Sequence, residues 1–444
     1  MSDVIVLGGG LAGLSAAAAL GGAGHSVTIL EARPFLGGRA TSYEIGAESI
    51  DNCQHVLLRC CANLLDFYKR LGVEEKIAFH REYTFLEPGG KRSVLHPGML
   101  PAPAHFFGSF LNLSFLSMSE KLAVGRAMQA ILREYGTRGD LDRITMRQWL
   151  EEKKQPARAI ERFWRQVLVS AVNEELDRMA ASHGLQVFRQ GFLARADSCD
   201  MGVPAVPLGD LYSSDAWKRI GNVEIRLRTP VTRMLIEDGA VRGVIANGEQ
   251  LEAHHYICAL PFERVAGVAP ELGLDLSAFE HSPITGIHLW FGRPVTDLPH
   301  ATLLDRTIQW MFNKGEGRYV QLVVSASRSL VEMPRAEVIS LALKELAEFF
   351  PSVRDAKLEK AHVVKEVRAT FSAKPGLESL RPVSRTSVRN LFLAGDWTRS
   401  GWPATMEGAV RSGYLAAEAV TTAAGAPQKF LRTHDSRAFA SVRG

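Results

Sequence analysis

The sequence predicts an α/β fold with a Rossmann-like parallel sheet and a second, interleaved α+β domain. Two observations support this prediction. A short apolar run at residues 4–7 passes into a glycine-rich turn, an alanine-rich stretch and a second apolar run. Near the other end, residues 391–393 form another apolar run, which delivers an acid to a turn. The chain has 444 residues, too many for one simple core, so we expect at least two domains.

The N-terminal residues show the pattern of a strand, a tight turn and a helix. Residues 8–13 read GGGLAG and contain G-x-G-x-x-G. In this motif Gly8 permits the turn, Gly10 lets the backbone approach a pyrophosphate, and Gly13 allows close packing of helix and strand. Leu11 and Ala12 then lie at the start of the helix, where free N–H groups face phosphates. The motif predicts a dinucleotide site.

A second strand and a second glycine loop follow. Residues 25–30 form the strand, and Glu31 stands where an acid accepts hydrogen bonds from a ribose 2′-OH and disfavours a 2′-phosphate. Ala32 and Arg33 come next. The run then continues to Gly37-Gly38-Arg39, which indicates a second close approach of the backbone, with a cation for phosphate.

This run resembles the E-x-R-x-x-x-G-G-R segment of the flavin amine oxidase and phytoene desaturase superfamily, whose members bind FAD through it. The resemblance implies an amine oxidase-like fold with FAD as cofactor. It also implies that the chain returns at its C-terminal end to complete the site. Gly395 and Asp396 match the A-G-D turn, whose acid hydrogen-bonds the ribityl–pyrophosphate region. The resemblance implies further contacts from the backbone of Val231 to the adenine, and from a helix entrance at Pro403, Ala404, Thr405 and Met406.

The predicted domains are discontinuous. Residues 1–80, 203–270 and 376–425 are expected to form the FAD-binding domain. Residues 81–202 and 271–375 are expected to form the substrate domain, and residues 426–444 a loose tail. Within the substrate domain, residues 97–116 hold three prolines, four phenylalanines and no charge. We expect this segment to contact a membrane or cover an apolar tunnel; the alternative is a buried connector.

A narrower resemblance lies in residues 51–55, Asp-Asn-Cys-Gln-His. They closely resemble the D-N-G-Q-H signature of the squalene-associated flavoproteins, the hydroxysqualene dehydroxylases of bacterial hopanoid synthesis, and the likeness extends over nearly the whole chain. It implies that reduced FAD delivers hydride to hydroxysqualene, which loses its allylic hydroxyl as water and becomes squalene. Two residues depart from the family: Cys53 and Arg59 stand where glycine is usual.

Candidate catalytic residues come from the same segment. Loss of a hydroxyl requires an acid, because hydroxide is a poor leaving group. We assign His55 as the acid and Asp51 as its orienting or electrostatic partner. The alternative is that both side chains only hydrogen-bond the backbone around the flavin.

Composition and charge limit the kinds of ligand and partner that we expect. The net charge is +4 without a basic run, so no nucleic-acid partner is expected. Five cysteines without a C-x-x-C pair argue against a disulfide framework or zinc site, and no metal is expected. No run of about 18 apolar residues occurs. We therefore expect a cytoplasmic protein, peripheral on the inner membrane surface, with an isoprenoid lipid substrate. A single dinucleotide motif implies an external electron donor.

Three other activities remain open. A carotenoid desaturase shares the fold and lipid substrate but oxidises it, and residues 51–55 argue against it. An amine oxidase fits poorly with the apolar segment 97–116. A non-catalytic carrier of prenyl lipids, resembling a flavoprotein without flavin, is disfavoured because Glu31, the Gly37–Arg39 loop and Asp396 are all present.

Overall fold

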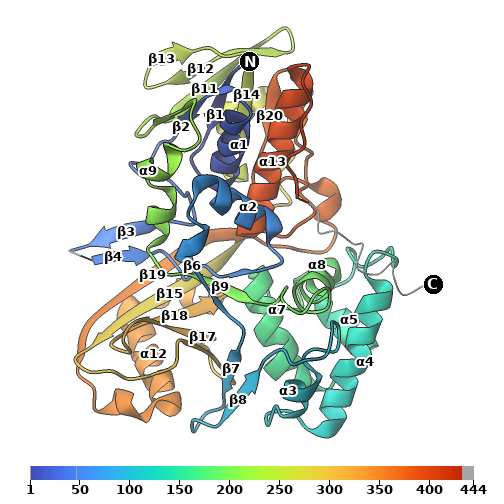
Figure 1. The fold of residues 1–444 in the computed structure, drawn as a ribbon, viewed down its shortest axis with the longest axis vertical. Coiled ribbons are helices and arrows are strands. Elements are labelled where there is room, and N and C mark those ends of the chain that lie inside the picture. Colours follow the sequence, from blue (N-terminus) through green and yellow to red (C-terminus); the bar gives the residue numbers. More distant parts are fainter. Residues whose placement is uncertain (1, 47, 433–444) are drawn as a thin grey trace.

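The computed structural model describes residues 2–46 and 48–432, which form three regions (Figure 1). One region holds a parallel sheet with helices packed on one face. A second holds a long, mostly antiparallel sheet backed by the helix α12 (Arg335–Phe349), and the third is helical. The predicted α/β class with a Rossmann-like parallel sheet and an amine oxidase-like architecture is confirmed.

The parallel sheet is assembled from remote parts of the chain. Its strand order is β10-β2-β1-β14-β20, and every neighbouring pair is parallel. The strands are β1 (Asp3–Leu7), β2 (Ser26–Leu30), β10 (Val223–Arg226), β14 (His255–Cys258) and β20 (Leu391–Leu393). Because all five run the same way, their carboxyl ends lie at one edge, where ligands of such sheets bind.

Two helices pack together beside this sheet. They are α1 (Leu11–Gly22) and α13 (Met406–Ala423), which lie side by side in Figure 1. Gly413 of α13 sits against α1: a Cβ at this position would lie 2.2 Å from the carbonyl oxygen of Ala12. The close contact between α1 and α13 therefore depends on the absence of a side chain at residue 413. Helix α2 (Ala62–Leu71) also packs against α13.

The second sheet has the order β19-β15-β18-β17-β16-β7-β8. One of its faces packs against α12, and side chains on the other face line a cavity. The strands of this sheet are β7 (Tyr83–Leu86), β8 (Arg92–Leu95), β15 (His281–Phe291), β16 (His300–Leu303), β17 (Trp310–Gly315), β18 (Tyr319–Ser325) and β19 (Leu358–Phe371).

The helical region covers the cavity from the other side. Capping boxes begin two of its helices, with Ser117 before α4 and Thr145 before α5. A π-helical turn, Ile160–Trp164, separates α6 from α7. The helices are α3 (Phe107–Leu111), α4 (Met118–Glu134), α5 (Met146–Glu152), α6 (Ala157–Ala159), α7 (Arg165–Val172) and α8 (Ala181–Gln186).

Smaller elements join the regions. The three-stranded sheet β5-β9-β6 connects the start of the chain to residues near 200. A separate hairpin sheet follows β10, and a two-stranded hairpin precedes residue 52. Their bounds are β3 (Ser42–Ile45), β4 (Glu48–Asp51), β5 (Leu57–Leu58), β6 (Ile77–His80), β9 (Met201–Pro204), β11 (Val231–Glu237), β12 (Ala240–Ala246) and β13 (Glu249–Leu251), with short helices α9 (Ser214–Trp217), α10 (Phe262–Val268) and α11 (Arg328–Val331).

The described part of the expected tail is held against the molecule. The amides of Phe430 and Leu431 both donate to Oε1 of Glu418, at 2.9 Å. The amide of Arg432 donates to Oδ1 of Asn63 at 2.7 Å. Because a buried carboxylate and a side-chain amide bind these backbone groups, residues 426–432 are not loose; residues 433–444 lie outside the described residues. The predicted domain bounds stay a prediction.

Candidate functional site

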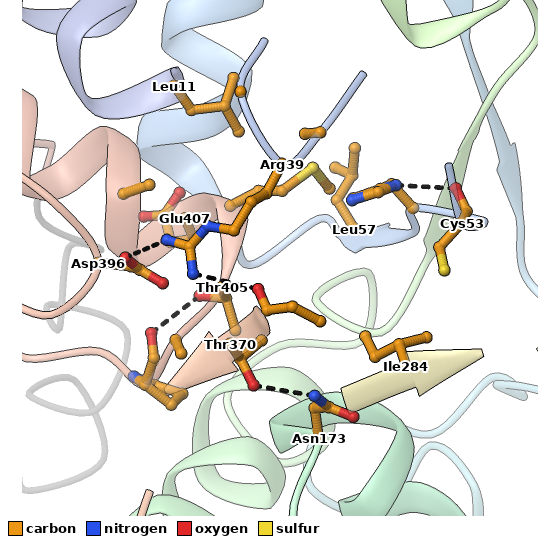
Figure 2. Close-up of a pocket in the computed structure, with 18 of the residues that line it drawn as sticks. Leu11, Arg39, Cys53, Leu57, Asn173, Ile284, Thr370, Asp396, Thr405 and Glu407 are labelled. Atoms are coloured by element: carbon orange, nitrogen blue, oxygen red, sulfur yellow. Dashed lines mark hydrogen bonds and ion pairs between the residues drawn. The ribbon is translucent and has the colours of Figure 1, made fainter. Parts of the chain in front are cut away.

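One large cavity lies where the carboxyl ends of the parallel strands face the second sheet (Figure 2). Its volume is about 910 Å³, in the upper part of the range for small-molecule sites. Side chains from both ends of the sequence line it. Of the residues that we predicted to hold a dinucleotide or flavin, all except Gly8 and Gly13 line this cavity: Gly10, Leu11, Ala12, Glu31, Ala32, Arg33, Gly37, Gly38, Arg39, Val231, Gly395, Asp396, Pro403, Ala404, Thr405 and Met406.

Gly8 and Gly13 act through the backbone instead. Gly8 has φ +104°, a conformation that L side chains rarely adopt, and it makes the turn after β1. A Cβ at Gly13 would lie 2.0 Å from the carbonyl oxygen of Gly8. The helix can therefore start immediately beside the strand only because both residues lack a side chain. The predicted turn and the predicted close approach are both present.

The N-terminus of α1 is open towards the cavity. Its N-cap is Gly10, which offers no side chain to the free N–H groups of the first turn. The second glycine loop lies directly against it: the amide of Gly37 donates to the carbonyl of Gly9 at 2.9 Å. A Cβ at Gly38 would lie 3.0 Å from Cα of Gly10. The two loops therefore form one surface of backbone groups that suits an anionic phosphate.

Glu31 is buried and its carboxylate holds both loops. Oε2 accepts a hydrogen bond from the amide of Gly9 at 2.7 Å, and Oε1 accepts one from the amide of Arg33 at 2.8 Å. Each carboxylate oxygen has capacity for a second hydrogen bond. Glu31 can thus shape the site and still accept a ribose hydroxyl, which stays its predicted role.

An ion pair joins the two ends of the chain across the cavity. Figure 2 shows Arg39 pointing to Asp396, and Nη2 lies 2.5 Å from Oδ1. Nη1 of Arg39 also donates to the carbonyl of Ala369 at 3.1 Å. The turn that carries Asp396 is itself held by Arg381, which is fully buried and donates to the carbonyl oxygen of Asp396 at 2.9 Å. Nothing in the sequence pattern singled out Arg381.

His55 lines the cavity, and Asp51 does not contact it. Nδ1 of His55 lies 2.9 Å from the carbonyl of Cys53, so this nitrogen carries the proton in the neutral ring. Burial lowers the pKa of His55, while the carbonyl of Cys53 and the charge of Asp51 act in the opposite direction. The imidazole is therefore mostly neutral at pH 7, and only its minor charged form can act as an acid.

An orienting role of Asp51 would require a hydrogen bond to His55, and its carboxylate makes its hydrogen bonds elsewhere; its electrostatic role stays a prediction. Oδ1 of Asp51 accepts from the hydroxyl of Ser42 at 2.7 Å and from the amide of Leu208 at 2.9 Å. Oδ2 lies 3.5 Å from Nζ of Lys314. The carboxylate therefore ties three segments together behind the cavity, and only its charge reaches His55.

The two departures from the family signature differ in position. Cys53 is buried and lines the cavity, and burial raises the pKa of its thiol, so it is uncharged. Arg59 points elsewhere: its guanidinium lies 3.8 Å from the ring centre of Phe79 and its Nε lies 3.2 Å from Oδ2 of Asp200. Of the two, Cys53 changes the wall of the cavity.

Glu407 is buried at the junction of α13 and α2. Oε1 accepts from the side-chain amide of Asn63 at 2.7 Å, and Oε2 accepts from the amide of Leu64 at 2.8 Å. Burial raises the pKa of Glu407, and these hydrogen bonds oppose that shift. The carboxylate therefore caps α2 and fixes the entrance of α13.

Beyond the predicted cofactor residues the cavity is mostly apolar. Aromatic and aliphatic side chains from β7, β8, β17 and the helical region form the wall: Tyr83, Phe85, Leu95, Phe192 and Trp310. A few polar side chains interrupt it, among them Gln166, Ser170 and Thr302. Sequence reasoning missed these polar residues, because an isolated glutamine, serine or threonine on a helix or strand gives no signal.

Within residues 2–46 and 48–432, no helix is both long and apolar enough to cross a membrane. No group of three or more His, Cys, Asp or Glu side chains in these residues is arranged to hold a metal ion.

Comparison with known proteins gives a consistent result. Residues 11–421 match the family described as flavin containing amine oxidoreductase. A probable zeta-carotene desaturase of Synechococcus elongatus is 27% identical, over 95% of this chain and 98% of its own. A 15-cis-phytoene desaturase of an Oncidium hybrid is 26% identical, over 94% of this chain and 77% of its own. The crystal structure of an oxidoreductase from Methanosarcina mazei has a TM-score of 0.71 at 18% identity, covering 93% and 98% of the two chains.

Proposed function

The chain belongs to the flavin containing amine oxidoreductase family and uses FAD, and from that premise we propose that it reduces hydroxysqualene to squalene. The observation that carries the proposal is the position of residues 51–55. This family-specific segment brings Cys53 and His55 to the wall of a cavity that is polar at its cofactor end and apolar beyond it. An isoprenoid chain fits the apolar part, and the relatives named as carotenoid desaturases support that class of substrate.

The residues present fit FAD. The open start of α1 and the stacked glycine loops suit the pyrophosphate, and Glu31 suits the adenosine ribose. Val231 would contact the adenine, and Asp396 with residues 403–406 would hold the ribityl and ring portions. When bound and reduced, FAD supplies a hydride.

The proposed reaction replaces one hydroxyl group by a hydrogen atom. The allylic carbon loses its bond to oxygen and gains a hydride, and the departing hydroxyl takes a proton and leaves as water. We assign the proton to Nε2 of the charged form of His55, while its Nδ1–H stays bonded to the carbonyl of Cys53. The apolar wall excludes water that would otherwise recapture an allylic cation. The electrons come from an external donor.

The test is anaerobic mixing of the reduced holoprotein with hydroxysqualene. We expect the flavin to reoxidise and squalene to form. Because burial lowers the pKa of His55, its acid form becomes more abundant as the pH falls, so the reoxidation rate should rise by up to about tenfold per pH unit between pH 8 and 6. Stopped-flow absorbance and product extraction measure both quantities.

The variant His55→Ala provides the control for the proton donor. It should retain FAD and lose the pH-dependent reoxidation. His254 is exposed and does not line the cavity, so His254→Ala should behave as the unmodified protein. Squalene formation by His55→Ala at an unchanged rate would remove His55 from the mechanism. Reduced protein that leaves hydroxysqualene intact would refute the proposed function.

A second candidate is carotenoid desaturation, which the named relatives favour. It removes hydride from a polyene, so His55 would act as a base and the rate would fall as the pH is lowered. Incubation of the oxidised protein with phytoene distinguishes the two: flavin reduction supports desaturation. A carrier without flavin does not fit a family of flavin oxidoreductases.

We further propose that residues 97–116, together with the start of α4 up to residue 122, form a segment that contacts a membrane surface. Half of the large apolar side chains exposed among the described residues come from it: Met99, Leu100, Phe107, Met118 and Leu122. Its inward side reaches the cavity, because the ring centre of Phe106 lies 6.1 Å from that of Phe192, which lines the cavity. A substrate leaving the bilayer would thus enter the chamber without crossing water.

Vesicle flotation tests this contact. The unmodified protein should float with phosphatidylglycerol vesicles, and Met99→Ser with Phe107→Ser should reduce the bound fraction at least about threefold, because apolar area buried in lipid is lost. Leu380→Ser is the control, because this side chain lies outside the segment and is 55% exposed, close to the 59% of Phe107. Equal flotation of all variants would contradict the proposal.

A further inference from the structure

The apolar wall of the cavity contains a small polar position that none of the assigned cofactor or proton-transfer roles uses. Gln166 of α7 and Thr302 of β16 both line the cavity, and their side chains are 4% and 0% exposed. Oε1 of Gln166 and Oγ1 of Thr302 have no hydrogen-bond partner among the described residues. A buried polar atom without a partner costs free energy, so an atom of this kind facing a binding cavity indicates a ligand group.

The sheet places Thr302 within an otherwise apolar row. In strand order β18-β17-β16-β7, the residues Val323, Trp310, Thr302 and Phe85 stand opposite one another in register. All four line the cavity. The row therefore presents three apolar side chains and a single hydroxyl to whatever fills the chamber.

Helix α7 brings Gln166 to the same place. The indole N–H of Trp310 donates to the hydroxyl of Ser170 at 2.7 Å, and this hydroxyl donates to the backbone carbonyl of Gln166 at 2.7 Å. Ser170 follows Gln166 by one helical turn, and Thr302 is the cross-strand neighbour of Trp310. Gln166 and Thr302 are thus both neighbours of one anchored indole ring, Gln166 through Ser170 and Thr302 through the strand register.

We propose that Gln166 and Thr302 form a subsite for one hydroxyl group on an otherwise hydrocarbon chain. A hydroxyl can donate to Oε1 of Gln166 and exchange a second hydrogen bond with Oγ1 of Thr302, while the chain packs on Phe85, Trp310 and Val323. A wholly hydrocarbon ligand leaves both oxygens without a partner. The subsite selects an isoprenoid alcohol over the corresponding hydrocarbon, and it favours release of a product from which the hydroxyl has gone.

This inference rests on the proposed function for the identity of the alcohol, hydroxysqualene, but not for the selection itself. The subsite has no assigned part in breaking the C–O bond. Its role is recognition, and recognition can be measured without turnover in the oxidised holoprotein, which holds no hydride to transfer.

The experiment titrates oxidised holoprotein with hydroxysqualene and with squalene, and follows the flavin absorbance change on binding. The two ligands share one carbon skeleton. The unmodified protein should bind the alcohol about ten- to a hundredfold more tightly than the hydrocarbon, as two hydrogen bonds to buried partners allow. In Gln166→Leu with Thr302→Val, which nearly conserve volume, the two affinities should become equal.

The variant Val167→Ala is the matched control, because Val167 lines the cavity beside Gln166 without a polar group. It should weaken both ligands equally and keep their ratio. Equal affinity of the unmodified protein for the two ligands would overturn the proposal and indicate that the oxygens hold only water. A preserved ratio in the double variant, with normal flavin content, would also overturn it. Neither result depends on whether reduced protein forms squalene.

Discussion

Replacing Asp396 by alanine is expected to give a folded protein that has lost most of its FAD. The carboxylate binds Arg39 at 2.5 Å and lies on the cavity wall at the turn after β20. Its loss removes both the predicted contact to the cofactor and the link between the two ends of the chain. A charge-assisted hydrogen bond contributes about 1.5–3 kcal/mol, so FAD affinity should fall about 10- to 150-fold. Reconstitution of apoprotein with FAD, followed by fluorescence, measures this constant.

The fold of this variant should survive. Arg39 is left without its partner, but its side chain is 32% exposed and can turn to solvent, so unfolding temperature should change little. Asp355→Ala, which removes an 80% exposed carboxylate far from the cavity, should keep full flavin content. A purified Asp396→Ala protein with unchanged FAD affinity would show that the two ends do not hold one cofactor.

Gly413→Ala should be strongly destabilising, although it adds only a single methyl group. The new Cβ would lie 2.2 Å from the carbonyl oxygen of Ala12 and 2.2 Å from the hydroxyl of Ser15, so α13 must move away from α1. Overpacking against backbone should cost about 3 kcal/mol or more. The same shift displaces residues 403–406 from the start of α1, so flavin content should fall too. Thermal unfolding and the ratio of flavin to protein absorbance check both effects.

The matched exchange is Gly125→Ala in α4. Its Cβ would meet no atom within 4 Å on an exposed helical face, so the exchange should stabilise the protein by about 0.5–1 kcal/mol. The contrast separates the loss of a close helix contact from the general effect of replacing a helical glycine. An unfolding temperature of Gly413→Ala equal to that of Gly125→Ala would contradict the packing described for α1 and α13.

Local patterns predicted the cofactor half of the molecule well. A glycine motif fixes backbone geometry over a few residues, so Gly8, Gly13 and the loop ending at Arg39 were found from sequence alone. The return of Asp396 to the same cavity was inferred from the resemblance to a superfamily, since no local pattern encodes a contact between residues 357 positions apart.

Side-chain partners at long range were not predictable in the same way. Asp51 was assigned as the partner of His55 because both belong to the segment that resembles a family signature; the carboxylate instead binds Ser42 and the amide of Leu208. The expectation of a loose tail fails for residues 426–432, because the amides of Phe430 and Leu431 bind the carboxylate of Glu418. Composition alone does not show that a helical glutamate binds a later segment of the chain. Thr302 and Gln166 gave no signal, because their meaning depends on the sheet register that places them beside Trp310.

The parallel sheet that begins with β1 takes its last strand, Leu391–Leu393, from near the end of the sequence. During synthesis the nascent chain therefore exposes the unpaired edge of β14 until residues 391–393 have left the ribosome. The helix that closes the cradle, α13, emerges later still. The complete cofactor site thus forms only after α13 has emerged, and until then the apolar wall of the cavity is exposed to aggregation.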